Sequence, residues 1–580
     1  MRGRFLVKVA VLAAVVGVVA AACGGSSTPS ATTPGATGTP TATPGPTQGG
    51  SAVLGAEQWP ECTNPITSCS AATWYWYSVG LPVLPQAMVV DLQGNFVATP
   101  LLTEAPSLDN GGVTQSPFSV TYKLNPDANW SDGTPITSAD FEFTWKAIMN
   151  TKGAYTTTGY QDIKSVDTSD PKTAVITFNK VFTDWADLFG GVYQGIFEKA
   201  AFPSADADKP DLSKEMLDSI PFSGGPWILD SWSKDQAIFK PNTNFYGQKP
   251  YLDQVTIVPR LDQPTEINSL LTGEVDAIFP QPSDVSLLDQ FKQNPSVDAE
   301  GAPGAYFEAL WFNHASDAFK DANIREGMMY AINRQAIIDA VIKLNNPSAE
   351  VLGCAFNSFK GLGPYCDTEY FGTDSFPYDP QKARDAFTKA GYDCSDANAA
   401  CTKGGQDLTI EYSTVSTNTR RTTTQELLQP DALKAGVKFK IKNYEAGVLF
   451  GDVGPKGKFT MADYATGGSP DPSITSSYSC NAIPTAANSY GGGNWNQWCN
   501  QQASDLMSQS DQELDATKRL DLMNQIYALE KQDFLSLPLY QLPNVGAWRT
   551  DKIAGPISDY IPSNLGMFYN MNYWYAASSS

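Results

Sequence analysis

Alternating hydrophobic and polar positions predict several short strands between Pro221 and Pro280. Trp227–Leu229 and Ala237–Lys240 are short runs of β-forming residues separated by a polar turn. Asp253–Pro259 alternates in the same way and is rich in Val, Thr and Ile. Because a half-buried strand hides every second side chain, this pattern predicts three strands in succession.

A helix is predicted directly after these strands. Pro264 suits the first turn of a helix, and Ile267 and Leu270 share one face at helical spacing. Gly273 is expected to end the helix, because glycine readily adopts the left-handed conformation that follows a helix. Val275–Phe279 then leaves as a buried strand. The stretch is therefore predicted to be a mixed α/β unit.

Strand-like alternation and helical spacing of hydrophobic residues also occur elsewhere in the chain. Val166–Phe178 predicts a hairpin with a polar turn, and Ala503–Gln532 has the spacing of a helix. Leu408–Tyr412 and Val437–Ile441 are predicted strands on either side of a helix at Thr424–Ala435. A β-α-β run of this kind indicates an α/β fold class. The 580 residues suffice for two or three domain-sized cores.

The N-terminus has the pattern of an export signal. Met1–Lys8 is basic, and Val9–Ala22 is an apolar run too short for a membrane span, so residues 1–22 are predicted to be a signal peptide. The following Cys23, after three alanines, resembles the lipobox cysteine of bacterial lipoproteins, although Ala20 stands where Leu is usual. Lipidation of Cys23 would anchor the protein outside the cytoplasmic membrane; ordinary secretion with cleavage at an Ala-x-Ala site is the alternative.

Residues 23–50 are predicted to be a disordered linker. Gly24–Gly50 contains only Gly, Ser, Thr, Pro, Ala and one Gln, so it has neither charge nor large apolar side chains to bury. A flexible chain of this length spans on the order of 30 Å. Such a tether after a lipidated cysteine would hold a folded domain just off the membrane surface.

The charge of the chain excludes some partners. Loss of residues 1–22 removes Arg2, Arg4 and Lys8 and takes the net charge from −22 to −25. An acidic chain of this kind is expected to bind neither nucleic acid nor anionic lipid through a basic patch. The acidity is also typical of a solvated surface that keeps a secreted protein soluble.

The cysteines predict disulfides. Without Cys23 the chain has eight, an even number in an exported protein. Sequence alone does not fix their connectivity, but close spacing favours four local pairs: Cys62–Cys69, Cys354–Cys366, Cys394–Cys401 and Cys480–Cys499. Metal binding is the weaker alternative, because there is no C-x-x-C pair and His314 is the only histidine. No metal and no cofactor are expected.

Five motifs appear in a characteristic order. Each combines turn, cap and strand residues, and they are spread over most of the chain. They are Asn129–Phe141 (NWSDGTPITSADF), Asn244–Gly247 (NFYG), Leu271–Asp276 (LTGEVD), Ala322–Arg334 (ANIREGMMYAINR) and Tyr378–Tyr392 (YDPQKARDAFTKAGY).

Together these motifs resemble the extracellular solute-binding proteins of ABC importers, of the peptide/nickel-binding class. The resemblance covers about Leu101 to Trp548. It implies a periplasmic-binding-protein-like α/β fold of two lobes with mixed sheets, a small accessory domain and a ligand cleft at the hinge. The implied boundaries are 51–97, 221–312 and 541–580 for lobe I, 98–220 for the accessory domain and 313–540 for lobe II. Two crossovers are expected near Trp311–His314 and Leu539–Asn544.

The resemblance also suggests where a ligand would bind. In peptide-binding members an Asp in a matching Asp-Pro segment pairs with the α-amino group of the peptide, and Asp471 is the corresponding residue. An Asx turn before Pro472 is the alternative role of Asp471. Ala72–Tyr77 (ATWYWY) corresponds to the first strand and following loop at the cleft mouth, with core packing as the alternative. The predicted ligand-binding residues are Trp74, Tyr75, Trp311, Asn313, Gly468, Asp471, Trp495 and Trp498.

The implied function is capture of an oligopeptide by hinge closure and its delivery to a membrane permease, by a monomer without enzymatic activity. Within the same fold, an oligosaccharide would suit the many Trp and Tyr side chains, and a metal chelate is a further possibility. A receptor that only senses ligand or organises a membrane complex is another class. A secreted acidic hydrolase would need paired carboxylates in a recognisable motif, which the sequence lacks. His314 would have to serve any Ser-His-Asp triad, and it is expected to be structural.

Overall fold

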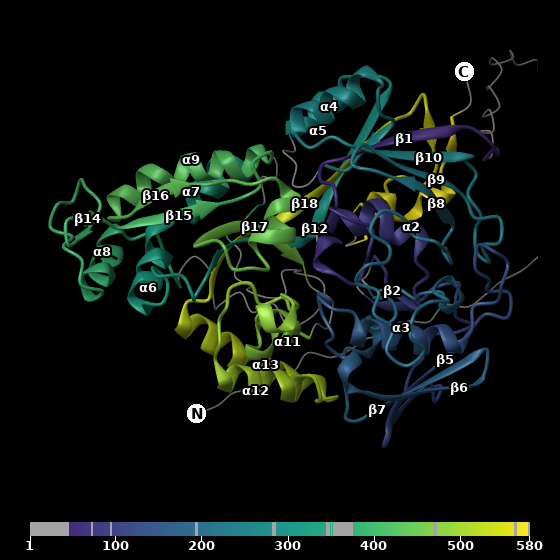
Figure 1. The fold of residues 1–580 in the computed structure, drawn as a ribbon. Coiled ribbons are helices and arrows are strands. Elements are labelled where there is room, and N and C mark those ends of the chain that lie inside the picture. The colour runs from purple at the N-terminus through teal and green to yellow at the C-terminus, as the bar shows by residue number, and fades with distance from the viewer. Residues whose placement is uncertain are drawn as a thin grey trace, which may run out of the picture. The chain divides into compact units, whose positions relative to one another are not determined.

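A ten-stranded mixed sheet is the central element of the computed structural model (Figure 1). The structure describes residues 46–70, 73–92, 95–191, 195–280, 286–343, 349, 351, 375–467, 473–561 and 565–577, and Pro46–Ser580 form one compact unit. The strand order is β16 (Lys438–Ile441), β15 (Thr409–Ser413), β17 (Met461–Gly467), β12 (Val297–Phe312), β18 (Ser536–Arg549), β11 (Ala277–Ile278), β1 (Ser51–Ala56), β10 (Gln254–Pro259), β9 (Ala237–Pro241) and β8 (Trp227–Trp232).

Two long strands in the middle of the sheet connect its halves. β12 and β18 are antiparallel and pair from Val297 opposite Arg549 to Trp311 opposite Ser536, with register shifts between. They coincide with the two expected crossovers. We call the part with β1 and β8–β11 lobe I, and the part with β15–β17 lobe II. The lobe II edge strand β16 presents Lys438 and Lys440, charges of a kind that discourage pairing with another chain.

Lobe I confirms the unit predicted from the local pattern. α4 (Gln263–Thr272) begins after Asp262, whose carboxylate accepts a hydrogen bond from the Thr265 N–H at 2.9 Å, and it ends at Gly273 with a φ of 81°. β1 pairs in parallel with both β10 and β11. The lobe also contains α5 (Ser286–Lys292), two two-stranded sheets and a 3₁₀ segment, Met567–Tyr573; the sheets are β2 (Met88–Val90) with β3 (Phe96–Ala98) and β19 (Ile553–Ala554) with β20 (Tyr575–Ala576).

The accessory domain is a four-stranded antiparallel sheet next to one helix. The sheet has the order β4 (Val113–Gln115), β5 (Phe118–Lys123), β7 (Thr173–Phe178) and β6 (Ile163–Asp170). β6 and β7 form the predicted hairpin. The helix α3 (Ser138–Asn150) has a capping box between Thr137 and Asp140, so this acidic residue has the predicted capping role.

The aromatic run 72–77 departs from the expectation. It was expected to be the first strand, but the described residues are helical, α1 (Thr73–Tyr75) followed by a π-helical segment Trp76–Gly80, and the first strand is β1. Four consecutive aromatic residues have no polar positions to mark a period, so their pattern cannot separate strand from helix. The local order is instead set by tertiary packing, because Trp74 and Tyr75 are fully buried.

Lobe II consists mainly of helices packed against β15–β17. The predicted β-α-β run is confirmed as β15, α9 (Thr419–Lys434) and β16, although α9 begins five residues earlier than expected. The predicted helix 503–532 is two helices that break at 511–515. The remaining elements are α6 (Ala322–Ala331), α7 (Arg334–Ile337), α8 (Pro380–Lys389), β13 (Thr402–Lys403), β14 (Gln406–Asp407), α10 (Ala446–Val448), α11 (Thr475–Tyr478), α12 (Gln501–Ser510) and α13 (Ala516–Asp533).

Three of the four predicted disulfides are present: Cys62–Cys69, Cys394–Cys401 and Cys480–Cys499. Cys354 and Cys366 lie outside the described residues, as do Cys23 and the expected signal peptide. In the described part of the chain, no helix combines the length and apolar character that a bilayer span requires. Gly49 and Gly50, the last residues of the expected linker, already bond to Tyr251 and Asp253 of lobe I.

Candidate functional site

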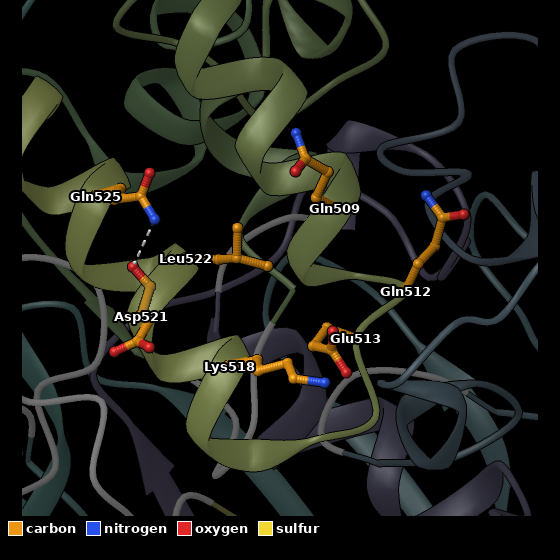
Figure 2. A pocket seen from close by; sticks show the side chains of 7 residues that line it. All are labelled: Gln509, Gln512, Glu513, Lys518, Asp521, Leu522 and Gln525. Atoms are coloured by element: carbon orange, nitrogen blue, oxygen red, sulfur yellow. Dashed lines mark hydrogen bonds between the residues drawn. The ribbon is translucent and has the colours of Figure 1, made fainter.

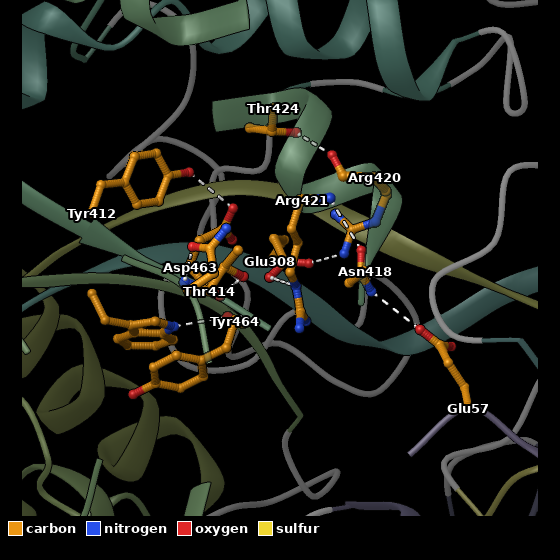
Figure 3. Close-up of polar contacts among 12 residues, drawn as sticks. Glu57, Glu308, Tyr412, Thr414, Asn418, Arg420, Arg421, Thr424, Asp463 and Tyr464 are labelled. Atoms are coloured by element: carbon orange, nitrogen blue, oxygen red, sulfur yellow. Dashed lines mark hydrogen bonds and ion pairs between the residues drawn. The ribbon is translucent and has the colours of Figure 1, made fainter. Parts of the chain in front are cut away.

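A buried carboxylate in the crossover strand β12 is the centre of the site. Glu308 is fully buried and receives hydrogen bonds from Arg420 and Arg421, which lie side by side in the first turn of α9 (Figure 3). The Arg421 Nε atom is 3.0 Å from Glu308 Oε1, and both guanidinium groups are almost completely buried. Burial opposes the charge of Glu308, but the two arginines outweigh it and lower its pKa to about 2.

A second acid lies beside this ion cluster. Asp463 of β17 is fully buried and accepts a hydrogen bond from the Tyr412 hydroxyl at 3.0 Å. Leu310 is the residue opposite Asp463, so Glu308 is its diagonal neighbour on the same face of the sheet. Burial and the charge of Glu308 raise the pKa of Asp463 well above its usual range. Both effects favour the neutral form of Asp463.

The two arginines retain unused hydrogen-bond donors. In the described structure, Nε and Nη1 of Arg420 and Nη1 of Arg421 have no hydrogen-bond partner although they are buried. The Arg420 guanidinium also lies over the Tyr540 ring, 5.2 Å from its centroid. Buried, unbonded guanidinium N–H groups are costly unless an anion satisfies them, so this cluster can accept a carboxylate from a ligand.

Aromatic side chains form a wall on the opposite face of the sheet from the arginines, because Trp311 and Tyr464 alternate with the positions of Glu308 and Asp463 along β12 and β17. Trp311 of β12 stacks on Tyr464 of β17 with centroids 5.3 Å apart, and its indole N–H donates to the Tyr464 carbonyl at 2.8 Å. Trp495 lies at the edge of Tyr464, and Tyr155 of the accessory domain meets Trp495 at 6.2 Å. Phe450 also packs against both rings, at 5.9 Å from Tyr464 and 6.3 Å from Trp495. These rings pack against one another as one largely buried group.

Lobe II also contacts lobe I and the accessory domain directly. The Asn418 amide donates to Glu57 Oε1 at 3.2 Å, and the Gly492 N–H donates to the Tyr155 carbonyl at 3.0 Å. Arg519 of α13 forms a buried ion pair with Asp184 of the accessory domain. These contacts join parts of the chain that a hinge motion would separate, so the structure corresponds to a closed arrangement.

The structure brings together only some of the predicted ligand-binding residues. Trp311 and Trp495 belong to the aromatic wall. Asn313 instead donates to the carbonyls of Gly457 and Phe459, and the Trp498 indole donates to Asp533, so both have structural bonds.

The other four predicted ligand-binding residues fall into two groups. Trp74 and Tyr75 lie in the hydrophobic core, where the Tyr75 hydroxyl donates to the Thr63 carbonyl at 3.0 Å. Their observed role is packing. Gly468 and Asp471 lie outside the described residues.

Sequence reasoning missed the ion cluster. Glu308 lies in the run Tyr306–Phe312 (YFEALWF), where one acid among six apolar residues predicts a buried partner of opposite charge. Arg420 and Arg421 lie two and three residues after the helix-capping Asn418, whose side-chain oxygen accepts the Arg421 N–H. A tandem arginine at a helix start is a signal for an anion site that could have been noticed.

Two other places in the described structure do not form a site. A groove of about 490 Å³ between α12 and α13 is lined by polar side chains and by Leu522 (Figure 2). His314 is half-buried, and desolvation together with the charge of Arg325 lowers its pKa to about 3, so it is a neutral imidazole. Over the described residues, no three His, Cys, Asp or Glu side chains gather as they would around a metal ion.

Comparison with known proteins identifies the family. The model for bacterial extracellular solute-binding proteins, family 5, matches residues 100–484. The oligopeptide-binding protein OppA of Mycobacterium tuberculosis is 26% identical over 448 residues, which cover 75% of this chain and 71% of OppA.

Solved structures agree on the fold. The oligopeptide-binding protein AppA of Bacillus subtilis, in complex with a nonapeptide, superposes with a TM-score of 0.78 at 19% identity and covers 92% of this chain and all of AppA. NikZ of Campylobacter jejuni, in complex with Ni(L-His), has a TM-score of 0.74 at 20% identity, with 90% and 99% coverage. One fold therefore accommodates different ligands. The family match over most of the chain shows that this protein belongs to the bacterial extracellular solute-binding proteins of family 5.

Proposed function

We propose that this protein captures oligopeptides for an ABC importer. It would act outside the cytoplasmic membrane, anchored through the lipidated Cys23, and would deliver its ligand to a membrane permease. The observation that carries the peptide assignment is the Arg420–Arg421 pair with its buried, unbonded donors. A free α-carboxylate is a chemistry that matches these donors.

The carboxylate of the ligand would bind where the guanidinium donors are unused. Hydrogen bonds to a charged group are worth about 1.5–3 kcal/mol each when the partner would otherwise stay unsatisfied. Ionised Glu308 already neutralises part of the positive charge of the two arginines.

The α-amino group of the peptide would pair with Asp471. This residue follows β17 by only four positions, and β17 carries both Asp463 and Tyr464 of the site. A carboxylate in a partly dry cleft forms a stronger charge-assisted bond than one on the surface. Amine and carboxylate would thus be held from one lobe, and backbone hydrogen bonds would supply the rest of the affinity.

Ligand capture would proceed by hinge closure about β12 and β18. The contacts Asn418–Glu57, Gly492–Tyr155 and Arg519–Asp184 exist only while lobe II meets lobe I and the accessory domain. A ligand that bonds to both sides favours this closed state by its difference in affinity between the two states.

Binding calorimetry of the Pro46–Ser580 fragment tests the proposal. A peptide pool is expected to give heat that is largely lost in Asp471→Ala, because the variant leaves the ligand ammonium without its partner. An oligosaccharide pool is the parallel arm. Saccharide heat that is unaffected by Asp471→Ala would contradict both the ligand class and the site while leaving the fold intact.

A further inference from the structure

The accessory domain contacts lobe II through two separate loops. Tyr155 lies in the first loop, where its carbonyl accepts the Gly492 N–H at 3.0 Å and its ring meets Trp495 edge-on at 6.2 Å. Gly491 of the same lobe II segment comes so close that a Cβ on it would lie 2.6 Å from the Ala154 carbonyl oxygen. A side chain at this position therefore has no room while the two surfaces are in contact.

The second loop is held by a backbone hydrogen bond and an ion pair. The Thr183 N–H donates to the carbonyl of Asp511 at 2.8 Å, in the turn between α12 and α13. The carboxylate of Asp184 pairs with Arg519 in the first turn of α13, and these two side chains are only 2% and 3% exposed. Removal of either partner would leave the other charge buried whenever the domains meet.

The accessory domain is also bonded to lobe I and moves with it. Both ends of the domain continue into lobe I, at β3 and at β8. The Tyr155 N–H donates to the Ile66 carbonyl at 2.8 Å, and the Ala87 N–H donates to the Phe189 carbonyl at the same distance. Tyr155 thus bonds to lobe I through its N–H and to lobe II through its carbonyl. When the lobes separate, the bonds to lobe II break and those to lobe I remain.

Two disulfides restrain the segments between which Tyr155 lies. Ile66 belongs to the loop closed by Cys62–Cys69, and Gly491–Gly492 belong to the loop closed by Cys480–Cys499. A loop that is already restrained loses less conformational freedom when it docks. Both surfaces are therefore largely formed before the domains meet.

We propose that the accessory domain is the latch of the cleft: its loops 153–155 and 183–184 hold lobe II in the closed arrangement. The inference rests on the proposed function only in that the lobes open and close. Because the domains move as rigid bodies, the two loops engage and release lobe II together. A change that prevents contact at one loop therefore also frees the other loop, which a local packing role would not do.

Amide hydrogen exchange of the full-length protein without ligand tests the latch. The reporter is the Thr183 N–H, because its bond to Asp511 protects it from exchange only while the domains meet. The variant is Gly491→Ala, which acts at the other loop. Within lobe II the added methyl group would be 3.2 Å from the Asn488 carbonyl oxygen, which a small shift relieves.

Gly451→Ala is the matched control. A Cβ at this lobe II position would lie 3.9 Å from the Glu61 side chain of lobe I, which is an ordinary contact. Gly491→Ala is expected to raise the exchange rate of the Thr183 amide about 5- to 150-fold, as overpacking by one methyl group would, and Gly451→Ala should leave the rate unchanged. Unaltered exchange in the pairing of β5 with β7 shows that the accessory domain remains folded.

Equal exchange of the Thr183 amide in Gly491→Ala and in the unaltered protein would overturn the proposal. An unprotected Thr183 amide in the unaltered protein would also overturn it, because the closed contact would then not be populated. If Gly491→Ala does not fold, Arg519→Gln replaces it, with the Gly492 N–H at the first loop as the reporter. No ligand is used, so failure here is distinct from failure of the proposed peptide binding.

Discussion

Replacing Glu308 by alanine is expected to lower the free energy of unfolding by about 3–5 kcal/mol. The substitution leaves the guanidinium groups of Arg420 and Arg421 buried without the carboxylate that both contact. Breaking a buried ion cluster in this way costs more than deleting an ion pair on the surface, because the remaining charges cannot reach water. Denaturant unfolding followed by tryptophan fluorescence measures the change.

A matched control lies two strands away in the same sheet, where β17 separates β15 from β12. Glu411 of β15 forms ion pairs with the exposed Lys440 and Lys442, so Glu411→Ala is expected to cost no more than about 1 kcal/mol. Similar losses for Glu308→Ala and Glu411→Ala would contradict the buried cluster. The contribution of Glu308 to stability should also depend on pH, because its pKa is lowered to about 2 in the folded state. This contribution is present above the ordinary glutamate pKa of about 4.3, and it is lost as the pH falls from there towards 2.

Amidation of the C-terminus of a bound peptide is expected to weaken binding roughly 10- to 150-fold. The neutral amide cannot satisfy the buried donors of Arg420 and Arg421 as a carboxylate does. Calorimetry with one peptide in its free and amidated forms measures the difference. Because only the ligand is altered, the folding of the protein is not in question.

The protein counterpart of this experiment is Arg421→Gln. If Arg421 binds the C-terminal carboxylate of the peptide, the variant should bind the free and amidated peptides with nearly equal affinity, as in a double-mutant cycle. Thermal unfolding of the variant shows whether it is folded. An undiminished preference for the free acid in Arg421→Gln, or no preference in the unaltered protein, would place the carboxylate elsewhere.

Elements with local signals were predictable from the sequence. The helix α4 has an N-cap, a proline in its first turn and a C-terminal glycine, and the hairpin β6–β7 has alternating residues around a polar turn. The disulfides could be paired because each cysteine has its partner within 7 or 19 residues. In all these cases the residues that determine the structure are near one another in the chain.

The site was only partly predictable because its members are distant in sequence. Its charged members come from four different parts of the chain: Glu57, Glu308, Arg421 and Asp463. The pairing of β12 with β17 and the docking of α9 bring them together. For the aromatic residues, the sequence instead suggested more ligand-binding positions than the structure brings together. Trp74 and Trp495 looked alike as candidates, and both are buried, Trp74 in the main core and Trp495 in a smaller hydrophobic cluster.

Competitive capture tests the central claim most directly. The purified protein is incubated with an equal mixture of a protein digest and oligosaccharides, separated from unbound molecules and denatured, and the released ligand is identified by mass spectrometry. The account predicts peptides with free C-termini, and their loss in Arg421→Gln. Release of saccharides from the unaltered protein, or of peptides whose capture is unaffected by the substitution, would contradict it.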